Sequence, residues 1–153
     1  MRYVIFSVLL CGLAACSGKS DTDKVVLEEA ARYHNEATEV QEQLEPMIDR
    51  IDSVKTRLAL KTTPEAKAIT QSLDSLKTAF ETWEENLVEV PGMKHEHHEH
   101  GEGEHHHHHH HNNNDTKDMP ADQLRDLQRE FLANIKLMQQ QTQQAMDRAK
   151  GLL

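Results

Sequence analysis

The chain has 153 residues, the size of one ordinary domain, and only 4% of them are aromatic, which limits the core it can build. Acidic residues outnumber Lys and Arg by 26 to 17, for a formal net charge of −9 at pH 7, so the sequence lacks the basic surface that nucleic-acid binding requires. Histidine is the anomaly in this composition, because eleven of the 12 histidines lie between His95 and His111.

The first residues, MRYVIFSVLLCGLAAC, have the pattern of a bacterial lipoprotein signal peptide. Arg2 is the positive start, and the apolar stretch from Tyr3 to Leu10 is shorter than the roughly 20 residues that span a bilayer. The stretch LAAC ending at Cys16 resembles the lipobox, whose cysteine is acylated and becomes the mature N-terminus. We therefore expect a signal peptide at residues 1–15, and the lipidated Cys16 and a flexible tether at residues 16–23. A plain secretory signal with a chance cysteine is the alternative.

Lipidation would leave the mature chain without a thiol, because Cys11 departs with the signal and Cys16 carries the lipid. No disulfide framework is then available. Several acyl chains on one cysteine anchor a protein stably. The sequence predicts a cell-envelope protein that is anchored to a membrane without entering it, and it leaves open which membrane.

Residues 24–153 are predicted to form a helical bundle, because apolar residues recur at alternating steps of three and four. The first stripe consists of Val26, Ala30, Tyr33, Ala37, Val40, Leu44, Met47, Ile51, Val54 and Leu58. Pro46 lies within it and removes one helical hydrogen bond. The unbroken spacing favours one helix kinked at Pro46, and a break there into two helices is the alternative.

The second helix is expected to begin at Thr63-Pro64, where a threonine caps and a proline takes the first position, and to end at Pro91-Gly92. Its stripe consists of Ala66, Ile69, Leu73, Leu76, Phe80, Trp83, Leu87 and Val90. The third helix begins near residues 118–121, and the glutamine-rich stretch 139–144 weakens its stripe. That stripe consists of Leu124, Leu127, Phe131, Ile135, Met138, Ala145, Ala149 and Leu152.

Three amphipathic helices joined in this way predict an all-α fold, an antiparallel three-helix bundle. Phe80, Trp83, Phe131 and Tyr33 all fall in stripes, so they are expected to fill the core. His34 lies beside the first stripe and is expected to be a polar residue on its flank.

The histidine-rich segment, residues 93–118, interrupts the bundle between the second and third helices. No apolar residue occurs in the 25 positions between Met93 and Met119. A segment with nothing to bury cannot offset its ordering entropy, so we expect a long disordered loop.

Neutral imidazole is the commonest metal ligand, and carboxylate oxygens can complete a coordination sphere. We expect zinc, nickel or copper(II) to bind loosely, with room for several ions per chain. The absence of cysteine argues against a closed structural zinc site or a copper(I) carrier. The predicted ligands are His95, Glu96, His97, His98, Glu99, His100, Glu102, Glu104, His105, His106, His107, His108, His109, His110 and His111.

Three other interpretations of this segment stay open. Seven consecutive histidines could be an expression tag, although the run is internal and a helix follows it. The segment could also be a neutral low-complexity expansion. Finally, it could respond to pH, because its formal charge would change from −4 to +7 if all eleven rings were protonated.

The lipobox, the segment Arg32 to Glu36 (RYHNE), the phrase FETWEENLVEVPG from Phe80 to Gly92, the histidine-rich loop and the C-terminal helix together resemble a group of small bacterial helical lipoproteins. Some of these carry the label viral A-type inclusion protein-like. The resemblance implies a helical envelope lipoprotein and transfers no catalytic residue. The loop alone is similar to the acidic, histidine-rich loop of zinc-uptake binding proteins, whose two-lobed α/β body this chain lacks.

The leading functional hypothesis is a membrane-tethered metal buffer or metallochaperone whose bundle docks a metal transporter or a client protein. The alternative is a structural or interaction lipoprotein that binds a partner helix or self-associates, with the loop incidental. An enzyme is not expected, because the sequence has no glycine-rich phosphate loop, no HExxH motif and no cysteine nucleophile after maturation.

Overall fold

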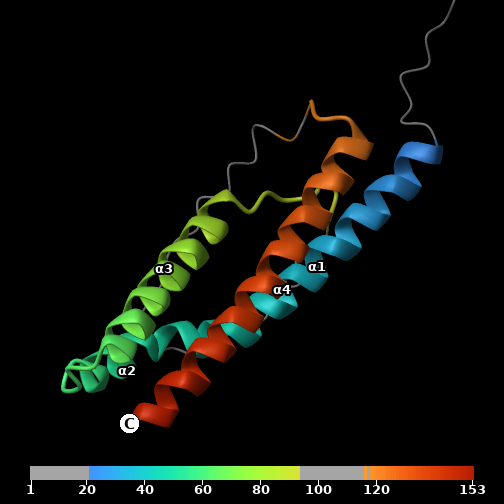
Figure 1. Ribbon diagram of the computed structural model, residues 1–153. Coiled ribbons are helices and arrows are strands. Elements are labelled where there is room, and N and C mark those ends of the chain that lie inside the picture. The colour runs from blue at the N-terminus through green and yellow to red at the C-terminus, as the bar shows by residue number, and fades with distance from the viewer. Residues whose placement is uncertain (1–20, 94–115, 117) are drawn as a thin grey trace, which may run out of the picture.

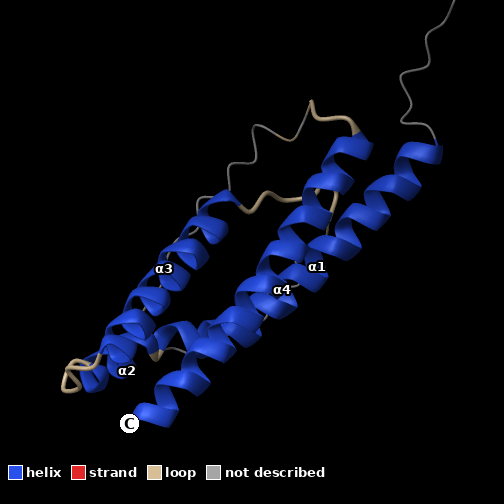
Figure 2. Ribbon diagram, in the orientation of Figure 1, coloured by secondary structure: helices blue, strands red, loops and turns tan. Residues whose placement is uncertain are grey.

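The computed structural model describes residues 21–93, 116 and 118–153, and every regular element in this part of the chain is an α-helix (Figures 1 and 2). The predicted all-α class is therefore confirmed. The helices are α1 (Asp21–Asp49), α2 (Ile51–Leu58), α3 (Pro64–Asn86) and α4 (Ala121–Leu152).

The first stripe forms a long helix and a short one, and the chain breaks at Arg50 and not at Pro46. Pro46 is exposed inside α1, where it costs one backbone hydrogen bond without stopping the helix. Ile51 of the predicted stripe is buried just after the break, whereas Met47, the stripe member before it, is only partly buried, and Ile48 takes the buried position. After Arg50 the chain changes direction, and α2 leaves the line of α1 (Figure 1). The kink or break expected at Pro46 therefore lies four residues later, at Arg50.

α1 begins at Asp21, so residues 21–23 are helical, although the sequence favoured a flexible tether there. Asp21 and Asp23 lie in the first turn, where negative charge complements the positive end of the helix dipole. Residues 1–15, the predicted signal peptide, lie outside the described residues.

α3 begins as predicted. Thr63 is the N-cap, its side chain accepts a hydrogen bond of 3.2 Å from the backbone of Ala66, and Pro64 opens the helix. The helix ends at Asn86, earlier than the expected Pro91-Gly92, because Leu87 adopts an extended backbone. Leu87 and Val90 are nevertheless buried, so the end of the second stripe packs against the core without being helical.

One apolar core joins all four helices, and every residue of the predicted second stripe is buried. α1 and α4 lie side by side along most of their lengths, and α3 packs against α4 (Figure 1). Near the end of α3, the indole of Trp83 donates a hydrogen bond of 3.0 Å to the carbonyl of Phe131 in α4. Nearer the start of α3, Ser75 lines one hollow together with Met138 of α4.

Aromatic rings occupy the contact between α3 and α4. The centroid of Trp83 lies 6.5 Å from that of Phe80 and 6.0 Å from that of Phe131, the second pair edge to face. Phe80 and Trp83 are buried, whereas Tyr33 and Phe131 are partly buried at the margin of the core. The expectation that aromatic residues fill the core is confirmed for Phe80 and Trp83, whereas Tyr33 and Phe131 are only partly buried.

Exposed ion pairs join α2 to α3. Lys77 of α3 lies 2.6 Å from Asp52 of α2, and Lys55 of α2 pairs with Asp74 of α3. Hydrogen bonds from Lys77 and Lys55 lower the pKa of Asp52, and Asp74 raises the pKa of Lys55. Because these pairs lie on the surface, each is expected to contribute little to the free energy of unfolding.

Among the described residues, no helix is both long and apolar enough to cross a membrane.

Candidate functional site

The residues predicted to carry the lipid and to bind metal lie outside the part of the chain that the structure describes. They are Cys16, predicted to carry the lipid, and the eleven histidines and four glutamates of residues 95–111. Over residues 21–93, 116 and 118–153, no three His, Cys, Asp or Glu side chains come together in a group that could hold a metal ion. What the structure describes is the base from which the histidine-rich segment leaves the bundle.

The chain enters this segment through a tight turn. Pro91 and Gly92 are its central residues, Gly92 has a φ of +89°, and the backbone N–H of Met93 donates a hydrogen bond of 3.2 Å to the carbonyl of Val90. A positive φ at the third residue of a turn favours glycine, and proline favours the position before it. Pro91-Gly92 therefore sets the direction in which the chain leaves the bundle.

Both ends of the segment pack onto the same small core. Met93, the first residue of the segment, and Met119, which follows its last residue, contact a cluster formed by Ala30, Val90 and Leu124. Thr116 is only 4% exposed, and its carbonyl accepts a hydrogen bond of 3.2 Å from the backbone of Met119. The two ends of the histidine-rich segment are thus held against α1 and α4.

The start of α1 lies at this same end of the bundle. A cavity of about 270 Å³ is lined by residues from the start of α1, from the turn after α3 and from the start of α4. They are Asp23, Leu27, Pro91, Thr116, Met119, Pro120, Ala121, Asp122 and Leu124. The start of α1, Met93 and Thr116 therefore lie at one end of the molecule, which we call the loop end.

A buried polar chain ties the loop end to the helices, and the sequence did not predict it. Gln128 of α4 is fully buried and donates through Nε2 to the carbonyl of Val88, 2.6 Å away. Its Oε1 lies 3.2 Å from Nδ1 of His34 in α1. Because Nε2 of Gln128 is the donor to Val88, its Oε1 is the acceptor, so Nδ1 of His34 carries the proton.

His34 is therefore a buried residue, 8% exposed, and its expected place on the polar flank of α1 is wrong. The reason is geometric. His34 follows Ala30 by four residues and precedes Ala37 by three, so it lies on the buried face, and Gln128 satisfies its ring. Spacing of four from Leu124 and from Leu132 would have indicated the burial of Gln128, but no apolar residue marked the position.

No family model, no curated protein and no solved structure matches this chain.

Proposed function

We propose that this protein is an envelope lipoprotein, anchored through Cys16, that binds divalent transition metals through the histidine-rich segment as a metal buffer or metallochaperone. The observation that carries the proposal is the ligand-rich composition of residues 95–111, inserted in a chain whose flanks are packed in place. Imidazole and carboxylate together suit zinc, nickel and copper(II), with availability deciding the occupant.

The architecture we propose is an antiparallel three-helix bundle in which α2 extends the first helix after a bend. The contacts of α3 with α4 support this arrangement. Trp83, late in α3, contacts Phe131, early in α4, whereas Ser75, earlier in α3, lies near Met138, later in α4. The histidine-rich segment would then return to the end at which α1 begins.

This arrangement gives the proposed anchor and the proposed metal ligands the same location. Thr116 lines the same cavity as Asp23, Met93 packs near Ala30 of α1, and Cys16 is only a few residues before α1. Metal ions bound by the segment would therefore be held near the membrane surface. A metal transporter embedded in that membrane, or a client protein beside it, is the partner that suits this position.

Calorimetric titration tests the proposal. The chain from residue 16 onward, with Cys16→Ser, contains every described residue, and we expect it to take up more than one equivalent of Zn²⁺, Ni²⁺ or Cu²⁺. Deleting residues 94–111 should abolish this uptake. Deleting only residues 112–115, which hold three asparagines and one aspartate, is the matched control and should leave it unchanged.

Equal metal uptake with and without residues 94–111 would contradict the metal proposal. Light scattering then examines the alternative, a structural lipoprotein that self-associates or binds a partner helix. A stable oligomer that neither metal nor the deletion changes would favour that alternative.

A further inference from the structure

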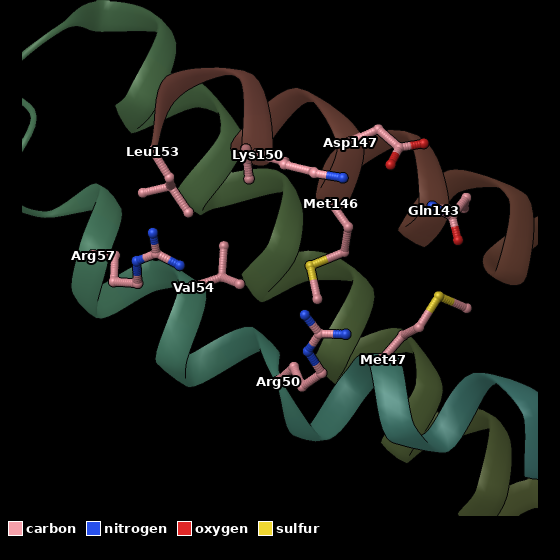
Figure 3. Close-up of a pocket in the computed structure, with 10 residues that line it drawn as sticks. Met47, Arg50, Val54, Arg57, Gln143, Met146, Asp147, Lys150 and Leu153 are labelled. Carbon is pink, nitrogen blue, oxygen red and sulfur yellow. The ribbon is translucent and has the colours of Figure 1, made fainter.

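A second cavity lies at the opposite end of the molecule from the loop end. It has a volume of about 590 Å³ and separates the bend between α1 and α2 from the last turns of α4 (Figure 3). We call it the distal cavity. Its lining residues are Met47, Arg50, Val54, Arg57, Gln143, Met146, Asp147, Ala149, Lys150 and Leu153.

Cationic and apolar side chains alternate around the distal cavity. Figure 3 shows Arg50, Val54 and Arg57 rising from the α2 side toward α4, from which Met146 and Leu153 point back. Asp147 is the one acidic residue of the lining, and its carboxylate points away from Arg50 (Figure 3). The lining therefore has three cationic side chains and one anionic side chain, in a chain whose formal net charge is −9.

None of the three cations is neutralised by the described part of the chain, where no carboxylate lies within ion-pair distance of Arg50, Arg57 or Lys150. Lys55, on the same short helix as Arg57, shows the contrast, because it pairs with both Asp52 and Asp74. The three cations at the cavity therefore have no carboxylate partner among the residues that the structure describes.

Helix dipoles favour each of these cations, but they do not explain why all three line one cavity. Arg57 and Lys150 lie in the last turns of α2 and α4, where a cation is favourable. Arg50 follows the last residue of α1 and is the N-cap residue of the shorter α2, so the negative end of α1 favours its charge, and its side chain makes no capping hydrogen bond. Three cationic side chains around one cavity that is also lined by apolar side chains suit an anionic ligand.

We propose that the distal cavity binds a single-chain carboxylate amphiphile, of the fatty-acid class, with one molecule per chain. The carboxylate would lie among Arg50, Arg57 and Lys150, since guanidinium groups bind carboxylates with two parallel hydrogen bonds. The acyl chain would cover Met47, Val54 and Met146, whose flexible thioethers adapt to an apolar ligand. The volume lies within the range of roughly 300–1,000 Å³ that is typical of small-molecule sites.

The cationic and apolar side chains of the lining account for the two parts of the ligand, its carboxylate and its acyl chain. A small anion alone would leave the apolar side chains in water, and a cationic amphiphile would meet the three positive groups. This inference is independent of metal binding, because the distal cavity contains no residue of the histidine-rich segment.

Methyl NMR locates the site directly. The chain from residue 16 onward, with Cys16→Ser, is labelled at its methionine methyl groups and titrated with dodecanoate below its micelle-forming concentration. We expect saturable shifts of Met47 and Met146, and none for Met93 and Met119, which lie at the loop end. Acetate and dodecyltrimethylammonium, at the same concentrations, should produce no saturable shift.

The double variant Arg50→Gln/Arg57→Gln should bind dodecanoate about tenfold more weakly or worse, as expected when charged partners of a carboxylate are removed. Arg32→Gln/Arg129→Gln is the matched control, because it removes two exposed arginines outside the cavity and should retain wild-type affinity. Arg50→Lys/Arg57→Lys keeps the charge and should retain measurable binding even though the guanidinium geometry is lost.

Circular dichroism of each variant establishes that the helices remain. Four outcomes would overturn the proposal. They are an absence of saturable binding by the wild type, equal losses in the test and control variants, shifts that spread to the loop-end methionines, and equally tight binding of the cationic amphiphile.

Discussion

At the scale of single residues, the most informative position is Gln128, a polar side chain with no exposed surface. One amide satisfies His34 of α1 and the carbonyl of Val88, so it joins three parts of the chain that are distant in sequence. Buried polar groups are costly unless they are paired, and this one is paired at both of its ends. Gln128 therefore specifies how α1, α4 and the turn after α3 meet.

We expect Gln128→Leu to destabilise the protein by about 1–3 kcal/mol, although leucine is apolar and similar in size. The substitution leaves the carbonyl of Val88 and Nδ1 of His34 without this partner in a dry environment. Urea unfolding followed by circular dichroism measures the change. Gln140→Leu on the exposed face of the same helix is the control. A loss for Gln128→Leu no greater than for the control would contradict the assigned role.

At the scale of elements, periodic apolar spacing predicted the all-helical class and most of the residues that are helical, but not every helix boundary. All eight positions of the second stripe are buried, and the cap at Thr63 and Pro64 begins α3 as expected. The errors occur where spacing carries no information. The bend at Arg50 was not predicted, because the apolar stripe continues across it. The end of α3 at Asn86 was not predicted, because Leu87 and Val90 are buried in extended backbone at the same spacing that a helix would give.

Polar residues on buried faces were the other error, because pattern analysis treats them as solvent-exposed. Gln128 and Thr142 continue the buried face of α4 between apolar neighbours, and Thr142 fills the gap that the glutamine-rich stretch seemed to leave. The hydrogen-bond partners of Gln128 come from α1 and from the turn after α3, so they cannot be found from the sequence of α4 alone, and the buried hydroxyl of Thr142 has no hydrogen-bond partner among the described residues. The candidate metal ligands depend on composition alone, and their prediction stays a prediction.

The cap of α3 provides a prediction for one element. We expect Thr63→Ala to cost about 1 kcal/mol, because the backbone N–H of Ala66 loses the hydroxyl that accepts its hydrogen bond. Thermal unfolding of the two proteins measures it. Thr62→Ala, one position earlier, removes an exposed threonine that does not cap the helix and should change the melting temperature little. Equal effects of the two substitutions would show that Thr63 does not act as a cap.

At the scale of the whole molecule, two ends with different chemistry are separated by long helices. The loop end contains the two ends of the histidine-rich segment and the start of α1, and the distal cavity is lined by cationic and apolar side chains. α1 has 29 residues, which at 1.5 Å per residue is about 43 Å. A ligand bound at one end would therefore have no direct contact with the other.

This separation predicts where a paramagnetic metal acts. Cu²⁺ broadens NMR signals of nearby nuclei, and the effect falls steeply with distance. If the histidine-rich segment binds Cu²⁺, the methyl signals of Met93 and Met119 should broaden, because these residues flank the segment at the loop end. The signals of Met47 and Met146, which line the distal cavity, should stay sharp.

Two controls make this result specific to the segment. Zn²⁺ has a filled d shell and binds the same kinds of ligand, so it should occupy the segment without broadening any signal. Replacing all eleven histidines of residues 95–111 with asparagine should abolish the Cu²⁺ effect on Met93 and Met119, because amide side chains are much weaker ligands for copper(II) than imidazole. Broadening that persists in this variant would place the copper on other groups of the chain. Broadening of Met47 and Met146 together with Met93 and Met119 would contradict the arrangement in which the metal-binding segment and the distal cavity lie at opposite ends.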